Sequence, residues 1–150
     1  MMKEFITHQL IKSDRDLDSL RDFLRVNQLP ADDLKLSDSL YLSYTADSHE
    51  ELVGSGGLEF YGNKALLRSL AVSQAMRSQS LGKQIVENLM QLVKEKDIKE
   101  IYLLTLTAYY FFLKLGFTEI NRNDVPEEIK SSTEFSQVCP TSARVMRLMI

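Results

Sequence analysis

Apolar residues recur with two different periods along this chain, and the two periods predict an alternation of strands and helices. Over residues 17–24 and 81–93 an apolar side chain returns every third or fourth position, which is the spacing of amphipathic helices. Short runs of alternating or continuous apolar residues are typical of strands. Strands are therefore expected at 4–11, 40–45, 51–60, 66–72, 101–107 and 118–121, and helices at 14–27, 81–96 and 108–115.

Local signals mark the ends of the first and last of these helices. Ser13 and Asp16 form the pattern of a capping box before the first helix, and Pro30 stops that helix. A second short helical turn is expected at 32–36. Gly116 occupies the position of a C′ glycine after the last helix, so the chain is expected to leave it abruptly.

Turns and glycines predict how the strands are joined. Strict alternation at 40–45 predicts a half-buried strand. Three glycines interrupt strand 51–60, which indicates a bulge or the close approach of another segment. These are Gly54, Gly56 and Gly57. The tight turn at 61–64 makes the next strand antiparallel, and the helix after it must cross to a parallel neighbour, so the sheet is mixed.

Residues 66–96 contain the clearest transition from strand to helix. The apolar run LLRSLAV is followed by a polar loop and then by the helix that begins near Leu81. A strand that turns sharply into a helix leaves the first helical N–H groups without partners, and the helix dipole adds positive potential there. Gly82 lets a ligand approach the backbone, and Arg77 supplies full charge. This loop is therefore a candidate anion site.

Composition restricts the class of protein without naming its chemistry. The chain has 150 residues, of which 44% are hydrophobic and 26% are charged, as expected for one compact globular domain spanning 1–150. A net charge of −3 with no basic run argues against nucleic acid or an anionic membrane as the main partner. The single cysteine, Cys139, excludes an internal disulfide and fits a cytoplasmic protein. A homodimer is compatible with these features.

Two motifs resemble those of the GNAT acetyltransferases. In that family the phosphate loop reads Arg or Gln, two residues of any type, Gly, any residue, then Gly or Ala. Arg77 and Gly82 match this pattern, while Ser80 stands at the first glycine. The run LLTLTAYYFFLKLGF, which ends at Phe117, matches the aromatic helix and Gly-Phe pair of the family. The segment DVPEEIKSSTEFSQVCPTSARVM that follows is most similar to N-acetyltransferases of arsenic-resistance operons, and then to the acetyltransferase domain of N-acetylglutamate synthase.

The resemblance implies an α/β fold of GNAT type, with a single mixed sheet of six to seven strands and helices on both faces. It implies acetyl-CoA as cosubstrate and no metal. The pantetheine arm of acetyl-CoA would enter where two central parallel strands splay apart, and a backbone N–H of 70–72 would stabilise the oxyanion. The residues implied to bind the cofactor are Leu70, Ala71, Val72, Arg77, Ser78, Gln79, Ser80, Leu81, Gly82, Lys83, Thr105 and Phe112.

The acid and base positions of the family are both substituted. Many relatives protonate the leaving thiolate with a tyrosine where this chain has Phe112. Tyr109, one helical turn away, is a candidate substitute, and packing is the alternative role for its ring. Many relatives also carry an acidic base where this chain has Arg68, which leaves Glu59 as the base candidate. Cys139 lacks a motif histidine, so a buried thiol is favoured over a nucleophile.

Arg68 has two open interpretations. A guanidinium between apolar neighbours in a central strand needs a partner, and Glu59 on the adjacent strand is one candidate. The other interpretation is a clamp for a carboxylate of the acceptor. The clamp favours acetyl transfer to the amine of a small anionic molecule, such as an amino acid or an analogue. Two alternatives stay open, namely a non-catalytic acyl-CoA-binding module and a protein N-acetyltransferase.

Overall fold

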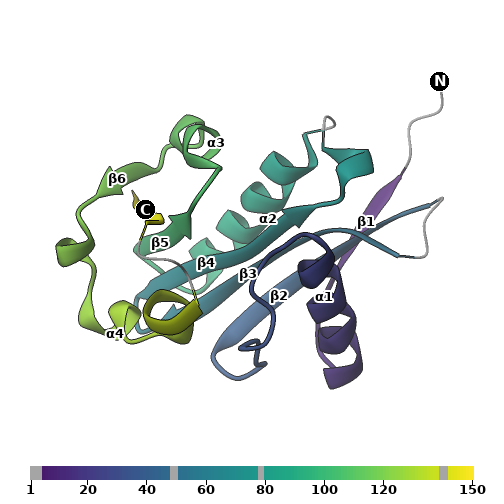
Figure 1. Ribbon diagram of the computed structural model, residues 1–150, viewed down its shortest axis with the longest axis horizontal. Helices are drawn as coiled ribbons and strands as arrows, with labels where there is room; N and C mark the ends of the chain where they lie inside the picture. Colours follow the sequence, from purple (N-terminus) through teal and green to yellow (C-terminus); the bar gives the residue numbers. More distant parts are fainter. Residues whose placement is uncertain (1–4, 48–50, 78–79, 139–141) are drawn as a thin grey trace.

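The computed structural model describes residues 5–47, 51–77, 80–138 and 142–150, which form one mixed seven-stranded sheet. The strand order is β1-β2-β3-β4-β5-β7-β6 (Figure 1). The strands are β1 (Ile6–Leu10), β2 (Ser39–Ala46), β3 (Leu52–Tyr61), β4 (Lys64–Val72), β5 (Glu100–Thr105), β6 (Thr118–Ile120) and β7 (Arg144–Met149). The helices are α1 (Asp14–Val26), α2 (Leu81–Glu95), α3 (Tyr109–Lys114) and α4 (Glu127–Lys130), with short helical segments η1 (Gln74–Met76), η2 (Arg122–Asp124) and η3 (Glu134–Val138).

The connections follow the predicted turns. Strands β1 to β4 form an antiparallel meander, and α2 carries the chain across to β5, which is parallel to β4. Strand β7 then inserts antiparallel between β5 and β6. The mixed sheet of the sequence prediction is confirmed, with seven strands among the described residues.

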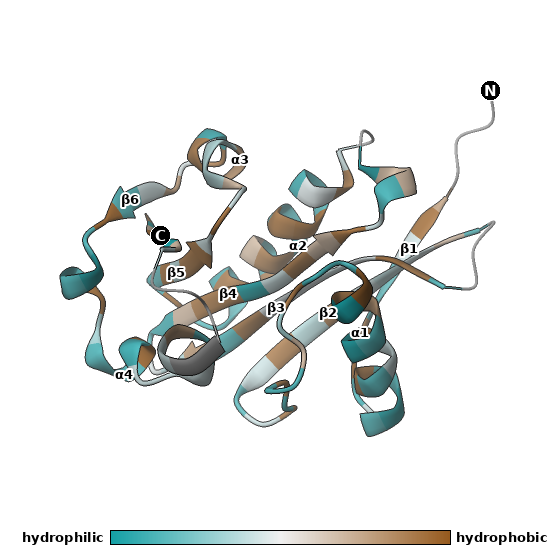
Figure 2. Cartoon of the chain, viewed as in Figure 1, coloured by the Kyte–Doolittle hydropathy of each residue, from teal (hydrophilic) through white to brown (hydrophobic). Residues whose placement is uncertain are grey.

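Helices cover both faces of the sheet, as predicted. Helix α2 packs over side chains of β2 to β5 in the largest apolar cluster, while α1 and α4 cover the opposite face. Strand β2 is therefore buried on both sides and not half-buried, because Leu42 packs toward α2 and Tyr41 packs toward α1. Figure 2 shows brown, apolar segments along the central strands and a largely teal α1, whose outer surface is polar.

The ends of α1 match the predicted signals. The Ser13 Oγ atom accepts a hydrogen bond from the backbone N–H of Asp16, and the helix ends at the Asn27 cap. The short helix expected at 32–36 is wrong, because these residues form turns with no helical segment. This difference matters for the site, since Asp33 lies in that loop. Within the described residues, no helix has the length and apolar character needed to cross a bilayer.

The glycines of β3 leave room for side chains of α2 and for the ring of Tyr41 to lie directly against the strand. A Cβ atom at Gly56 would lie 2.6 Å from Cγ2 of Ile85 and 2.9 Å from Cδ1 of Leu89, both on α2. At Gly57 a Cβ atom would lie 2.5 Å from the ring of Tyr41 on β2. Close approach of a neighbouring segment is therefore confirmed, and it sets how near α2 lies to the strands.

Candidate active site

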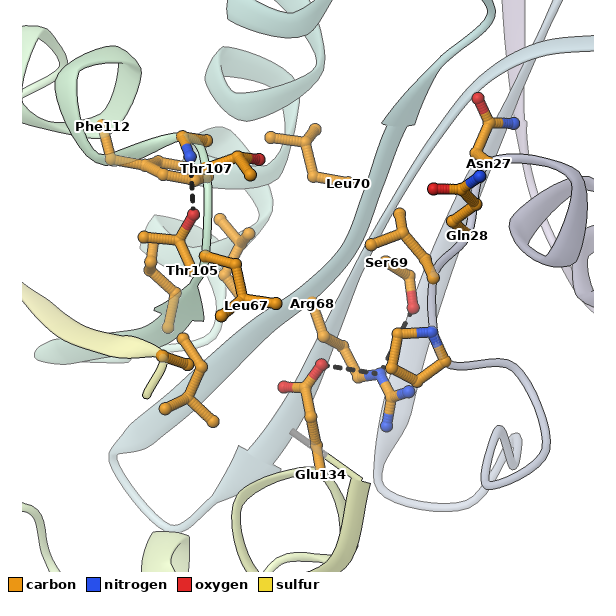
Figure 3. A pocket seen from close by; sticks show the side chains of 17 residues that line it. Asn27, Gln28, Leu67, Arg68, Ser69, Leu70, Thr105, Thr107, Phe112 and Glu134 are labelled. Carbon is orange, nitrogen blue, oxygen red and sulfur yellow. Dashed lines mark hydrogen bonds and ion pairs between the residues drawn. The ribbon is translucent and has the colours of Figure 1, made fainter. Parts of the chain in front are cut away.

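The central parallel strands separate at the middle of the sheet. Strands β4 and β5 pair only from Lys64↔Glu100 to Leu66↔Tyr102, and beyond that point they diverge. A cavity of about 690 Å³ lies at the divergence (Figure 3). The residues that line it include 67–70 of β4, 103–108 at the end of β5 and just after it, 27–30 in the loop after α1, and Glu134 of η3. The splayed strands that the family resemblance implied are thus present.

A β-bulge in β4 shapes the wall of this cavity. Ser55 and Gly57 of β3 pair with Ala71 and Arg68, so two residues of β4 lie opposite one residue of β3. Ser69 adopts a left-handed φ of 59°, which is uncommon for a side chain other than glycine, and its carbonyl accepts a hydrogen bond of 2.7 Å from Ser55 Oγ. The bulge leaves Ser69 and Leu70 without register partners on β3.

The bulge also changes which face each β4 side chain occupies. Leu66 packs in the cluster beneath α4, and Leu67 packs in the cluster beneath α2. After the extra residue, Leu70 packs on the α2 side and Ala71 on the α1 side, the opposite of a regular alternation from Leu66. The inserted residue therefore brings Leu70 to the α2 side of the sheet, and Leu70 and Arg68 both line the cavity.

The start of α2 has the predicted strand–loop–helix geometry. Ser80 is the N-cap residue of α2 and adopts a left-handed conformation. Its side chain accepts no hydrogen bond from the first N–H groups of the helix. Arg77 is exposed, and its guanidinium donates to the Val72 carbonyl at 3.1 Å and to Asn27 Oδ1 at 3.4 Å. Gly82 lies against α3, where a Cβ atom would come within 3.3 Å of the Phe111 ring.

Several predicted cofactor residues lie outside the cavity wall or outside the described residues. Ser78 and Gln79 belong to the second group. Cys139, which was predicted to be a buried thiol, also lies outside the described residues. Lys83 is exposed at the start of α2, with its ammonium group 3.9 Å from Glu87. Their roles stay predictions.

Thr105 and Phe112 do line the cavity. The Thr105 Oγ1 atom accepts a hydrogen bond of 2.9 Å from the Ala108 N–H at the start of α3. Phe112 is buried, edge-on to Phe117. Tyr109 is half-buried and is not among the residues that line this cavity, and its ring lies 4.4 Å from the guanidinium of Arg144. Its role as an acid stays a prediction.

Arg68 is the centre of a buried charged cluster. Its guanidinium is fully buried and binds both carboxylate oxygens of Asp33, with Nη2 to Oδ1 at 2.8 Å. Glu59 is a more distant partner, 3.6 Å from Nη1, and Glu134 lies 3.9 Å from Nε. The Nε–H also donates to Ser69 Oγ at 3.2 Å. The predicted neighbour Glu59 is therefore present, but the main partner is Asp33 from the loop after α1.

One guanidinium faces three carboxylates, so the charges in this cluster do not balance. Burial acts to raise the pKa of Asp33, but the hydrogen bonds and charge of Arg68 outweigh it and lower the pKa. Burial raises the pKa of Glu59 above its usual value, although Arg68 opposes this. Burial raises the pKa of Glu134 to about 7, and the carboxylates of Glu59 and Asp33 add to the shift.

Glu59 and Glu134 occupy different positions relative to the cavity. Glu59 of β3 is buried and does not line the cavity, whereas Glu134 does. Figure 3 shows Glu134 reaching from η3 toward Arg68, with Ser69 on the other side of the guanidinium. Sequence reasoning missed both Asp33 and Glu134. Glu134 lies inside the segment 124–146 that carried the subgroup resemblance, yet one glutamate in a serine-rich segment gives no local signal of burial.

The comparisons with known proteins identify the family. A family model described as acetyltransferase (GNAT) family matches residues 7–117. The chain belongs to this family. It is 32% identical over 87 residues to an uncharacterised N-acetyltransferase of Chlorobaculum tepidum, covering 57% of this chain and 56% of that protein. It is also 30% identical over 94 residues to an amino-acid acetyltransferase of Mycobacterium tuberculosis, covering 62% of this chain and 51% of the relative. The chain thus spans little more than half the length of these curated relatives.

Solved structures confirm the GNAT fold. The N-acetylglutamate synthase of Neisseria gonorrhoeae, solved with coenzyme A and N-acetyl-glutamate, superposes with a TM-score of 0.73 at 14% identity, over 99% of this chain and 36% of that one. A Mycobacterium tuberculosis protein solved with CoA and the ligand NLQ gives a TM-score of 0.74 at 21% identity, over 95% of this chain and 99% of the other. The predicted fold is therefore correct for this acetyltransferase-family chain.

Proposed function

We propose that this chain is an N-acetyltransferase that transfers the acetyl group of acetyl-CoA to the amine of a small molecule. The observation that carries the proposal is the cavity at the divergence of β4 and β5, because both splayed strands and the buried carboxyl group of Glu134 line it. The family match and the CoA-bound structural neighbours support the same activity.

In this proposal the pantetheine arm lies between β4 and β5, and the pyrophosphate lies on the backbone of residues 77–83 at the start of α2. The thioester then reaches the bulge, where residues 70–72 offer backbone N–H groups to the oxyanion of the tetrahedral intermediate. Thr105 and Phe112 form the opposite wall. No group of His, Cys, Asp or Glu in the described part of the chain is arranged to hold a metal ion.

For the acceptor we propose an amino acid or an amino-acid analogue. Two comparisons support this class, namely the relative described as an amino-acid acetyltransferase and the synthase solved with N-acetyl-glutamate. The arsenic-operon resemblance of segment 124–146 favours an analogue. For Arg68 to bind the acceptor's carboxylate directly, Asp33 would have to release the guanidinium. Otherwise a different residue must bind that carboxylate.

The proposal is tested by incubating the protein and acetyl-CoA with a panel of amino acids, amino-acid analogues, diamines and peptides, with free thiol release as the readout. Turnover with an amino acid or analogue supports the proposal. Tight binding of acetyl-CoA without turnover of any amine would indicate the binding module. Turnover confined to peptides would indicate a protein acetyltransferase.

Replacing Gly82 with valine is expected to weaken coenzyme A binding at least about tenfold, a loss of about 1.4 kcal/mol. The new side chain would press on the Phe111 ring and occupy the approach to the first turn of α2. Gln84→Val, an exposed position on the same helix, is the control for adding a β-branched residue. Isothermal titration with coenzyme A measures both variants, and unchanged affinity in Gly82→Val would contradict this placement.

Tyr109 is the remaining candidate for the acid that protonates the thiolate. Because its side chain does not line the cavity, we expect Tyr109→Phe to keep turnover within about twofold. The phenyl ring retains the contact with Arg144, and a thiolate whose pKa is near the ~8.5 of a free thiol leaves without help. Turnover is measured from pH 6 to 9, with Phe112→Tyr as the companion variant, expected to be neutral or mildly activating. A tenfold loss in Tyr109→Phe at high pH would establish it as the acid.

A further inference from the structure

We propose that Glu134 is the general base that takes the proton from the acceptor's ammonium group, an inference that rests on the proposed amine acetylation. Glu134 is the acidic side chain on the wall of the cavity between β4 and β5. Its side chain is only 8% exposed, and its Oε2 atom has no hydrogen-bond partner among the described residues. A buried carboxylate oxygen without a donor is costly unless a ligand supplies one.

The arrangement around Arg68 leaves this carboxyl group free to exchange a proton. Asp33 takes both Nη atoms of the guanidinium, so Arg68 offers Glu134 only a distant contact of 3.9 Å at Nε. Glu59 adds a second negative charge to the cluster, and like charges at short range disfavour a second ionised carboxylate. Burial raises the pKa of Glu134 to about 7, with the charges of Glu59 and Asp33 adding to the shift and that of Arg68 opposing it. A base is most effective when its pKa is near the working pH.

Charged and titratable groups from three other segments of the chain interact with Glu134. The charged and titratable groups that face it are Asp33 from the loop after α1, Glu59 and Tyr61 from β3, and Arg68 from β4. On the neighbouring side of η3, Arg122 lies over the Phe135 ring and donates to the Ala143 carbonyl. Arg68 therefore moderates the charge of Glu134 from a distance, and it is not assigned a contact to the acceptor.

In the proposed step two protons leave the acceptor nitrogen, one to Glu134 and one to the thiolate. The ionised Glu134 accepts one proton from the ammonium group and leaves a neutral amine. The amine nitrogen bonds to the acetyl carbon, and the carbon–sulfur bond of the thioester breaks with its electron pair on sulfur. The second proton lost from nitrogen goes to the thiolate, giving coenzyme A and the N-acetyl product. Glu134 then returns its proton to water.

The test compares Glu134→Gln with Glu59→Gln and with Glu127→Gln, an exposed carboxyl group on α4. In the wild type, kcat/KM with the best amine of the panel is expected to rise with pH and to level off above an inflection near pH 7. In Glu134→Gln this inflection should disappear and kcat should fall by about 10²–10⁴-fold, the usual range for a general base. The Glu127 variant should match the wild type.

Folding is controlled by coenzyme A titration and thermal melts. A raised pKa stabilises the folded protein at pH values below the ordinary carboxyl pKa, and this contribution is lost as pH rises through about 7. Glu134→Gln should therefore melt at or above the wild-type temperature at pH 8 and bind coenzyme A normally. Wild-type kcat and an intact inflection in Glu134→Gln would overturn the proposal, as would loss of the inflection in Glu59→Gln alone. If the wild type acetylates no amine, the proposed function fails instead.

Discussion

Replacing Arg68 with methionine is expected to lower the free energy of unfolding by about 3–5 kcal/mol at pH 8, the usual cost of removing one partner of a buried ion pair. Methionine keeps much of the side-chain volume but leaves three carboxylates near one another without a cation. For a domain of this size the melting temperature should fall by roughly 10 °C. Differential scanning calorimetry and urea unfolding measure the change.

The exposed ion pair between Arg25 and Asp32 is a matched control, because Asp32 directly precedes Asp33 in the chain. Arg25 binds Asp32 at 2.8 Å, with about half of the Arg25 side chain exposed and 92% of the Asp32 side chain exposed. Arg25→Met should therefore lower the melting temperature far less than Arg68→Met does. Asp33→Asn added to Arg68→Met should recover part of the loss, because it removes one of the unpaired charges.

The same variant decides between the two interpretations of Arg68. If Arg68 clamps the acceptor, Arg68→Met keeps its stability while the KM for an amino-acid acceptor rises about tenfold to a hundredfold. If Arg68 organises the carboxylates, stability falls and coenzyme A binding survives in the folded fraction. The bidentate contact with Asp33 favours the second result.

Gly56→Ala is expected to destabilise the protein by about 1–3 kcal/mol and to weaken coenzyme A binding as well. The added methyl group would lie 2.6 Å from Cγ2 of Ile85, a methyl group attached directly to the branched Cβ. The Ile85 side chain is fully buried, so this methyl group cannot move away freely. Helix α2 must then move off the sheet, and the N-terminus that carries the proposed pyrophosphate site moves with it. Urea unfolding and isothermal titration measure the two effects.

Gly54→Ala is the control for this prediction. Its new methyl group would meet the terminal atoms Ile85 Cδ1 at 3.0 Å and Leu81 Cδ2 at 3.1 Å, which can shift by small side-chain rotations. We expect a cost below about 1 kcal/mol and normal coenzyme A affinity. Equal effects at the two glycines would show that the spacing of α2 from the sheet is not what Gly56 sets.

Local sequence signals predicted most of the elements that form the frame of this site. The apolar stripe of α2, the Ser13 cap of α1 and the glycine after α3 each depend on neighbours within a few positions, so their spacing is visible in the chain. The loop at 32–36 was mispredicted because its polar residues suit either a helical turn or an irregular loop. Its actual course depends on Asp33 reaching Arg68.

The bulge in β4 was not visible in the sequence either. Gly56 on the facing strand suggested an irregularity, but the extra residue lies at Ser69, which takes a left-handed conformation without being glycine. That conformation is stabilised by the hydrogen bond from Ser55, a residue on another strand. A propensity-based prediction has no access to such a contact.

The sequence by itself determined the order of strands and helices from β1 to β6, the crossover through α2 and the loop at its start, because these follow from periodicity, turns and caps within short windows. It did not predict α4 or β7, the strand that inserts between β5 and β6. Only the tertiary structure decided how the buried charges are shared. Arg68 and Asp33 are 35 positions apart, and Glu134 comes from the last quarter of the chain. Which carboxylate pairs with the guanidinium, and which is left beside the cavity with a raised pKa, depends on distances and burial that arise only when distant segments pack together.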